Sequence, residues 1–156
     1  MSIVKRFVIG VPGLDKLVGE VAAPYTILIA GHPGAGKTTL ASTICYANAL
    51  KGEKCLYISF YEDKEKLFRY MKRLGLELRE IELNGLFKFV KLPLTFDINM
   101  IIDEVGKLVG EGYSVIVVDS ITALLEVVRE NVEKRAWLLN YFYQLPVLFN
   151  GLLILV

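Results

Sequence analysis

The stretch "GHPGAGKTTL", from Gly31 to Leu40, decides the fold. It contains a glycine, four further residues, a second glycine, a lysine and a threonine. It follows the apolar run Tyr25–Gly31 ("YTILIAG") and opens a segment with helical spacing, Lys37–Leu50. A glycine-rich turn between a strand and a helix is the P-loop pattern, in which backbone amides and the positive end of the helix dipole surround phosphate groups. The stretch therefore predicts a phosphate-binding loop on an α/β fold.

The residue types in this loop match the needs of ATP with Mg²⁺. The glycines let the backbone pass close to the phosphates, Lys37 can reach the β- and γ-phosphates, and the Thr38 hydroxyl can coordinate Mg²⁺. The motif accepts almost any residue at position 32, so we expect His32 to serve as loop structure rather than in catalysis. The expected ATP-binding residues are Gly31, His32, Pro33, Gly34, Ala35, Gly36, Lys37, Thr38 and Thr39.

Asp119 is the second candidate ligand of the metal. It closes the apolar run "SVIVVDS" (Ser114–Ser120), so its carboxylate is expected at the carboxyl edge of the sheet, where ligands bind in such folds. There it can hold Mg²⁺ through water. The alternative is that Asp119 only caps the next helix or turn.

Five apolar runs bounded by turn residues predict the strands. Because these runs are continuous rather than alternating in polarity, we expect strands that are buried on both faces. They are Tyr25–Gly31, Lys54–Phe60, Leu86–Val90, Ser114–Ser120 and Gly151–Val156.

Segments with helical spacing lie between these runs. Lys37–Leu50 is the first, and Asp63, Asp97 and Asn131 can cap three more, the last running toward Gln144. The expected buried positions are Leu67, Tyr70, Met71 and Leu74 in the Asp63 helix, which Gly75 ends, and Ile101, Ile102, Val105, Leu108 and Val109 in the Asp97 helix. Alternating strands and helices predict a doubly wound, mostly parallel α/β sheet.

Composition indicates one domain over residues 1–156, since 54% of the residues are hydrophobic. Lysine plus arginine (18) nearly balances aspartate plus glutamate (17), so nucleic acid is not indicated as a partner. The basic residues Arg69, Lys72 and Arg73 are expected to form a solvated helix face, with contacts to a nucleic-acid backbone as the alternative. Cys45 and Cys55 are expected to be buried free thiols, which fits a reducing cytoplasm.

The stretch from Ala136 to Val156 lacks charge and has the length of a membrane span. Pro146, "FNG" (Phe149–Gly151) and the polar residues Asn140, Gln144 and Asn150 interrupt it. We therefore expect a helix, a turn at this point and a buried strand, and no contact with a membrane. The amino terminus has no apolar region long enough for a signal peptide, so a cytoplasmic location is expected.

Beyond the loop, the chain resembles RecA-type ATPases, and among them the KaiC-like branch. The resemblance rests on "GVPGLDKLVG" (Gly10–Gly19), "GHPGAGKTT", "GEKCLYISFYEDKEKLFRYMKRLGLEL" and "VIVVDSITALL". It implies a RecA-like P-loop NTPase core that binds ATP and Mg²⁺, with Lys37 and a carboxylate after the second strand in catalysis. Members commonly have two adjacent glutamates there, and this chain has Tyr61 and Glu62. Glu62 is the candidate that activates water, the alternative being a first-turn acid that favours the helix dipole.

The resemblance also implies a strand order, in which the fifth strand lies between the Asp119 strand and the loop strand. The chain stops at Val156 inside that fifth strand, so we expect a domain that is incomplete at its carboxyl end and a loop strand with an open edge. Ring-like or filamentous assembly is common in this family. The helix containing "WLLNYFYQL", apolar nearly all around, is therefore expected either to be deeply buried or to be covered by another subunit or a protein partner.

The leading functional hypothesis is a slow ATPase whose cycle serves regulation or assembly. The first alternative is a nucleotide-gated module that binds a protein partner without meaningful hydrolysis. A second alternative is a recombination accessory protein that binds DNA.

Overall fold

A five-stranded, fully parallel sheet forms the centre of the molecule in this computed structural model, which describes residues 3–95 and 97–156. Its strands are β3 (Tyr25–Leu28), β4 (Cys55–Ser59), β5 (Phe87–Lys91), β6 (Val115–Asp119) and β7 (Leu152–Leu155). They lie in the order β3-β7-β6-β4-β5. The last strand thus lies between the loop strand β3 and the Asp119 strand β6, as expected.

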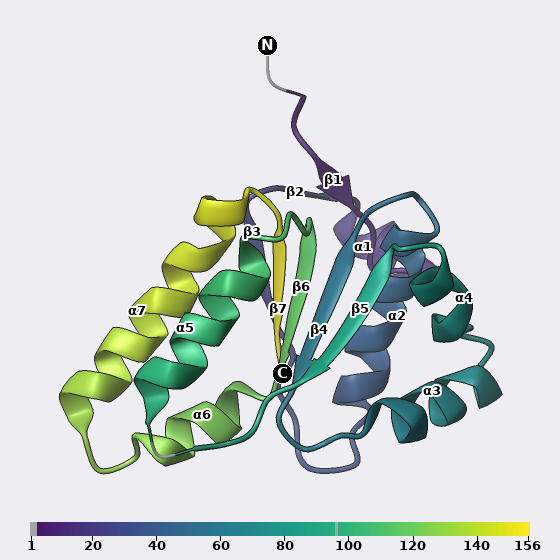
Figure 1. Cartoon of the computed structure of the whole chain (residues 1–156). Coiled ribbons are helices and arrows are strands. Elements are labelled where there is room, and N and C mark those ends of the chain that lie inside the picture. The colour runs from purple at the N-terminus through teal and green to yellow at the C-terminus, as the bar shows by residue number, and fades with distance from the viewer. Residues whose placement is uncertain (1–2, 96) are drawn as a thin grey trace.

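Helices cover both faces of this sheet (Figure 1). One face carries α2 (Lys37–Ala49), α3 (Lys64–Arg73) and α4 (Leu78–Leu83), and the other carries α5 (Ile98–Val109), α6 (Ile121–Val127) and α7 (Val132–Phe149). Side chains of β4 alternate between the two layers, so that Tyr57 packs in the α2 layer and Leu56 in the α5 layer. The doubly wound α/β class is therefore confirmed.

A short amino-terminal unit, which the sequence did not predict, precedes the sheet. It consists of β1 (Arg6–Phe7), α1 (Pro12–Val18) and β2 (Val21–Ala22), and β1 pairs antiparallel with β2. Asn48 of α2, fully buried, fixes this unit to the core. Its side chain accepts from Val8 N (3.0 Å) and donates to Val8 O (2.8 Å).

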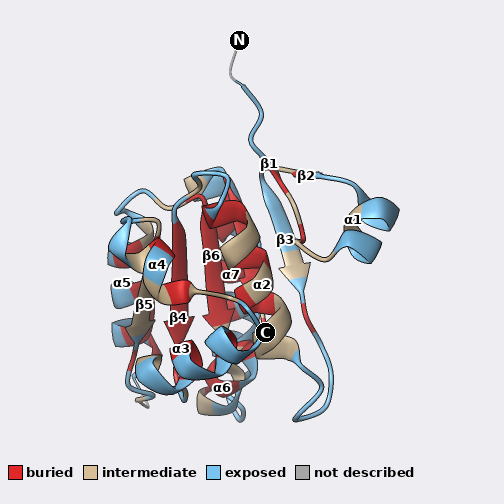
Figure 2. Cartoon of the chain, turned by 90° about the vertical axis from the view of Figure 1, so that its right-hand side faces the viewer, coloured by how far each residue is buried: buried red, intermediate tan, exposed pale blue. Residues whose placement is uncertain are grey.

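The strands differ in burial according to their place in the sheet (Figure 2). β4 is buried along its whole length, and β6 is buried up to Val118. The expectation of burial on both faces was wrong for β3, where Tyr25 is 46% and Leu28 is 64% exposed. The reason is position, because β3 is the last strand on its side of the sheet and has β7 as its strand neighbour.

The buried face of α3 also differs from the expected one. Leu67 and Met71 are buried as predicted, but Tyr70 and Leu74 are more than half exposed. Phe68 is buried instead, because its ring packs 5.8 Å from that of Phe87 on β5. The helix is therefore turned toward β5, and Tyr70 is left on the outside.

The predicted helix caps show two outcomes. The Asp97 carboxylate accepts from Asn99 N (3.1 Å), and the Asn131 side chain accepts from Lys134 N (2.9 Å), so both are side-chain caps as predicted. Asp63 stands at the start of α3, but its carboxylate accepts from Lys91 Nζ at 2.6 Å rather than from the helix. Lys91 thereby lowers the pKa of Asp63 below its usual value.

Helix α7 continues past Gln144, toward which it was expected to run, as far as Phe149, and the turn falls in the expected "FNG" stretch. Pro146 lies inside it, and the turn comes at Asn150, whose left-handed conformation (φ 48°, ψ 55°) ends the helix. Proline costs the helix one backbone hydrogen bond. Leu145 and Pro146 are both buried, and the burial of these apolar side chains opposes that loss. Within the described residues, 3–95 and 97–156, no helix is both long and apolar enough to span a bilayer.

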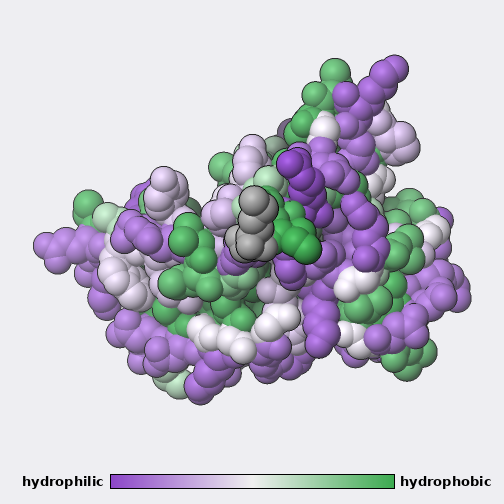
Figure 3. Space-filling view, turned by 90° about the horizontal axis from the view of Figure 1, so that it is seen from above, coloured by the Kyte–Doolittle hydropathy of each residue, from purple (hydrophilic) through white to green (hydrophobic). Residues whose placement is uncertain are grey.

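Figure 3 shows the amino-terminal edge of the sheet, opposite the loop, where hydrophilic and hydrophobic side chains are interspersed.

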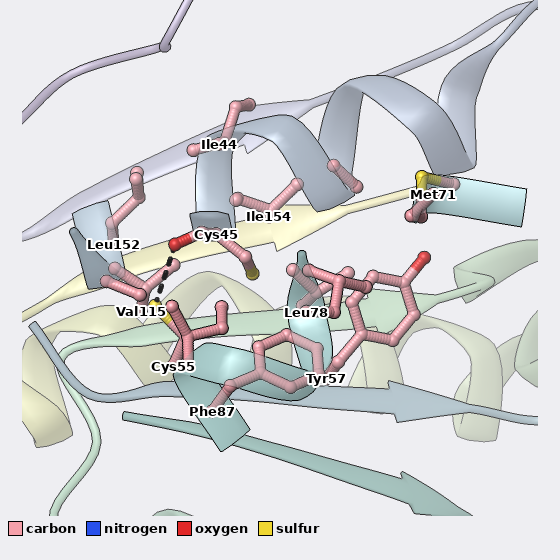
Figure 4. Close-up of a cluster of buried hydrophobic side chains, with 14 of the residues drawn as sticks. Ile44, Cys45, Cys55, Tyr57, Met71, Leu78, Phe87, Val115, Leu152 and Ile154 are labelled. Carbon is pink, nitrogen blue, oxygen red and sulfur yellow. Dashed lines mark hydrogen bonds between the residues drawn. The ribbon is translucent and has the colours of Figure 1, made fainter. Parts of the chain in front are cut away.

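Cys45 and Cys55 are free and buried, as the sequence predicted. They lie close together, since the Cys55 thiol donates to the Cys45 carbonyl oxygen at 3.3 Å (Figure 4). Burial raises the pKa of Cys55 well above its usual value. Both thiols therefore behave as small apolar groups of the core.

Candidate nucleotide-binding site

The loop between β3 and α2 has a backbone that only small residues allow. Gly34 (φ 83°) and Gly36 (φ 86°) adopt left-handed conformations that favour glycine, and Gly36 directly precedes the first residue of α2. A Cβ at Gly31 would lie 3.2 Å from the Ala35 Cβ, closer than packing normally allows. The loop is thus a tight turn at the amino end of a 13-residue helix, a geometry suited to an anion.

Lys37 lies over this loop. Its Nζ donates to the carbonyl oxygens of Gly31 and His32, both at 2.9 Å, and the residue is half-buried. The ammonium group therefore stands at the loop with only neutral partners, where phosphate oxygens can replace them. The ring of His32 lies against the loop itself, with Nδ1 3.0 Å from the Pro33 carbonyl oxygen.

Thr38 and Asp119 meet at the carboxyl edge of the sheet. Thr38 Oγ1 donates to Asp119 Oδ2 at 2.8 Å, although the two residues are 81 positions apart in sequence. Asp119 is the last residue of β6, and Thr38 is in the first turn of α2, so the parallel sheet brings them together. A hydroxyl beside a carboxylate is the kind of oxygen pair that binds Mg²⁺ together with phosphate oxygens and water.

An open cleft of about 460 Å³ lies against these groups. Of the predicted site residues, it is lined by Pro33, Gly34, Gly36, Lys37, Thr38, Thr39 and Asp119. Tyr61 and Tyr70 also line it, which the sequence did not indicate for Tyr70. Gly31, His32 and Ala35 lie in the same loop and shape its turn rather than the cleft wall.

Tyr61 and Glu62, which follow β4, do not both face the cleft. β4 ends at Ser59, whose hydroxyl accepts from Glu62 N at 3.0 Å. The Glu62 carboxylate lies 3.5 Å from Lys66 Nζ, one helical turn further along. Among the described residues, Tyr61 lines the cleft and Glu62 does not. The Glu62 carboxylate is thus paired with Lys66 and does not line the cleft.

Tyr57 was not among the site residues predicted from the sequence, yet its hydroxyl donates to Asp119 Oδ2 at 2.6 Å. The available signal was its polar tip within the otherwise apolar strand "CLYIS", because a buried tyrosine hydroxyl usually has a hydrogen-bond partner. Which partner it has depends on the neighbouring strand, and the sequence alone does not show that strand's register.

Comparisons with known proteins agree with this geometry. The chain matches the protein family described as "ATPase: KaiC" over residues 7–149. It is 30% identical over 125 residues to the circadian clock protein KaiC2 of Synechocystis, an alignment that covers 78% of this chain and 22% of that protein. It is 28% identical over 88 residues to a UPF0273 protein of Pyrococcus furiosus, covering 56% of this chain and 36% of that protein. The chain therefore spans well under half the length of either relative.

The fold is shared with a solved structure. A KaiC-like protein of Pyrococcus horikoshii superposes with a TM-score of 0.82 at 27% sequence identity. The superposition covers 98% of this chain and 71% of that chain.

Proposed function

The chain belongs to the KaiC family of ATPases, and from this premise we propose that it binds ATP with Mg²⁺ in the cleft beside the loop and hydrolyses ATP slowly. The hydrogen bond of 2.8 Å between Thr38 and Asp119 carries the proposal. This hydrogen bond joins the Thr38 hydroxyl to the Asp119 carboxylate at the end of β6, and Lys37 lines the same cleft. These are the protein groups that a Mg²⁺–triphosphate complex requires.

Each group has a proposed role. The loop amides and the amino end of α2 would bind the phosphates, and Lys37 would exchange its two carbonyl partners for phosphate oxygens. Mg²⁺ would be held by Thr38 directly and by Asp119 through water, and it would neutralise charge that develops on the phosphate oxygens. The geometry of the glycines and the oxygen pair fits both ligands.

Slow hydrolysis is proposed because the carboxylate that would activate water does not line the cleft. Glu62 is the candidate base, and its contact with Lys66 has to open before its carboxylate can reach the cleft. Tyr61, which lines the cleft, carries a phenol, and phenols remain protonated near neutral pH. The cycle of such an ATPase would serve regulation or assembly rather than rapid turnover.

The same observation favours a second candidate function. If Glu62 stays with Lys66, the chain would bind ATP and respond to it without hydrolysis, as a nucleotide-gated module for a protein partner. Both functions use the same ATP site, and they differ only in the fate of the γ-phosphate.

The wider setting is proposed as follows. Residues 1–156 would act as one nucleotide-binding domain, and the exposed apolar side chains of α7, Leu139, Tyr143 and Val147, would support a homo-oligomer or a protein partner. The two free thiols are what a reducing cytoplasm maintains. The near balance of charge gives nucleic acid no particular support as a partner.

Single-turnover hydrolysis at saturating ATP tests the proposal. We expect a slow rate for the wild type and a rate about 100-fold lower for Glu62→Gln, since a general base contributes about 10² or more. Titration calorimetry should give unchanged ATP affinity. Glu65→Gln, which changes an exposed acid in the same helical turn, is the control and should leave the rate unchanged.

Two outcomes contradict parts of the proposal. Equal rates for wild type and Glu62→Gln with intact binding would remove Glu62 from the mechanism and favour the module without hydrolysis. Failure of the wild type to bind ATP would refute both functions.

A further inference from the structure

The side chain of Tyr57 is fully buried and its ring is fixed by other rings. Its centroid lies 5.7 Å from that of Phe89 in a stacked arrangement and 6.4 Å from that of Phe87 in a tilted one. Figure 4 shows the ring among Met71, Leu78 and Phe87. The position of the hydroxyl is therefore set by the core and not by solvent.

Strand register explains why this hydroxyl reaches the edge of the sheet. Tyr57 is paired with Val117, and Ser59 is paired with Asp119, two residues further along both strands. Residues two apart share a face, so Tyr57 and Asp119 both face the α2 layer. The long phenol spans this offset and its hydroxyl donates to Asp119 Oδ2 at 2.6 Å. A phenylalanine ring in the same place would fill the core but could not donate.

Two hydroxyls converge on one oxygen of Asp119. Thr38 donates at 2.8 Å and Tyr57 at 2.6 Å, and both hydrogen bonds end on Oδ2. Among the hydrogen bonds of the described residues, none ends on the other oxygen, Oδ1. The carboxylate is thus held in one orientation by a group of the loop helix and a group of the core.

We infer that Tyr57 is a positioning residue for the magnesium site, holding the Asp119 carboxylate so that Oδ1 remains available to the metal and its water. The inference rests on the proposed function, because it assumes that Mg²⁺–ATP binds here. A residue of the buried core, on β4 and outside the loop, would thus contribute to the metal site.

The two donors, Thr38 and Tyr57, would have different roles when Mg²⁺–ATP binds. Thr38 would have to coordinate the metal through a lone pair of its hydroxyl oxygen while its proton is donated to Asp119. Tyr57 lies outside the cleft lining and can keep its hydrogen bond throughout.

Calorimetric titration of ATP with excess Mg²⁺ and with EDTA tests the inference. The measured quantity is the gain in affinity due to Mg²⁺, the ratio of the two Kd values. We expect Tyr57→Phe to reduce this gain about tenfold, because outer-shell partners of metal ligands typically contribute 10- to 100-fold in metal affinity. The Kd in EDTA should be unchanged, since Lys37 and the loop amides are intact. Tyr113→Phe, which removes a comparable hydrogen bond to Glu111 (3.0 Å) before β6, should match the wild type.

A second variant separates positioning from a general packing effect. In the Asp119→Asn background, Tyr57→Phe should reduce the gain due to Mg²⁺ no further, because the carboxylate that it positions is already gone. An additional loss in that background would overturn the inference.

The remaining outcomes are also decisive. If the wild type gains affinity from Mg²⁺ and Tyr57→Phe gains equally, the inference fails and the proposed function stands. If Tyr57→Phe loses affinity in EDTA, Tyr57 supports the whole loop and not Asp119 in particular, and the inference is wrong. If the wild type binds no ATP under either condition, the proposed function fails, and the inference fails with it.

Discussion

At the scale of single residues, the hydrogen-bond partners of the Lys37 ammonium group are carbonyl oxygens of the same loop. Lys37 Nζ is held by the carbonyl oxygens of Gly31 and His32, which are neutral acceptors. A triphosphate offers charged acceptors, and hydrogen bonds between charged groups are about twice as strong as neutral ones. Lys37 thus exchanges weak partners for strong ones when a nucleotide binds, and this exchange makes it the most informative residue to remove.

The variant Lys37→Ala should bind ATP about 10- to 100-fold more weakly. The loss corresponds to a hydrogen bond with a charged partner, about 1.5 to 3 kcal/mol. Titration calorimetry of the folded variant measures it. Lys51→Ala, at the far end of the same helix, is the control and should bind as the wild type does. Unchanged affinity in Lys37→Ala would remove the loop from the nucleotide site.

Tyr61 lines the cleft at one of the two positions for which the family resemblance implies a glutamate. Tyr61→Glu should raise the single-turnover rate of ATP hydrolysis by about 100-fold, the contribution of a well-placed general base. Tyr61→Gln has a similar side chain that cannot accept a proton, and it should leave the rate at the wild-type level. A rate increase in both variants would mean that tyrosine obstructs the cleft, and that the added carboxylate is not the cause.

At the scale of helices and strands, continuous apolar runs were a sufficient signal for all five strands of the main sheet. The runs persist because the central strands are covered by helices on both faces. The short helices α4 and α6 were missed, since six or seven residues give little periodicity. The exposure of Tyr70 was missed because the aromatic rings of β5, distant in sequence, decide which face of α3 is buried.

Some residues of the candidate site could be predicted from local sequence, and others depend on contacts with distant segments. The loop, Lys37, Thr38 and Asp119 could be placed from the sequence, because a strand, a glycine-rich turn and a helix define their positions locally. The directions of Tyr61 and Glu62 could not be placed, because they depend on where β4 ends and on the ion pair with Lys66. Tyr57 depends on strand register, which is a property of two segments and not of one.

The attachment of the amino-terminal unit to α2 gives a prediction about stability. Asn48→Ala should lower the free energy of unfolding by about 1 to 3 kcal/mol, because the half-buried backbone N–H and carbonyl groups of Val8 lose their partner. Urea denaturation measures the change. Asn140→Ala, at an exposed position of α7, should change stability by less than about 0.5 kcal/mol. Similar small effects of both substitutions would mean that the unit is not fixed through Asn48.

At the scale of the whole molecule, one side is apolar and uncovered. One edge of β3 pairs with β7, and the other has no strand partner among residues 3–95 and 97–156. Beside it lies a groove of about 740 Å³, lined by residues of β3 and α7 that include Tyr25, Leu28, Tyr143 and Val147. An exposed strand edge next to apolar side chains favours pairing with another chain.

The polypeptide of residues 1–156 is therefore expected to self-associate as its concentration rises. Light scattering after size-exclusion chromatography should give a mass above that of the monomer, 17.5 kDa. Leu28→Lys places a charge on the edge strand and should shift the mass toward the monomer. Leu83→Lys, at a position 80% exposed on α4, is the control and should not. A monomeric wild type at high concentration would contradict the prediction.

The order of the strands also determines when the loop can take its shape during synthesis. β3 leads directly into the loop, yet its neighbour in the sheet is β7, the last of the five strands in chain order, with Tyr25 paired to Leu152. All the residues between these two strands have to be made before this pairing forms, and contacts of such long range slow folding. Until then the apolar segment before the loop has no place in the sheet. The strand that leads into the glycine-rich loop is thus one of the last of the five strands to be paired in the sheet.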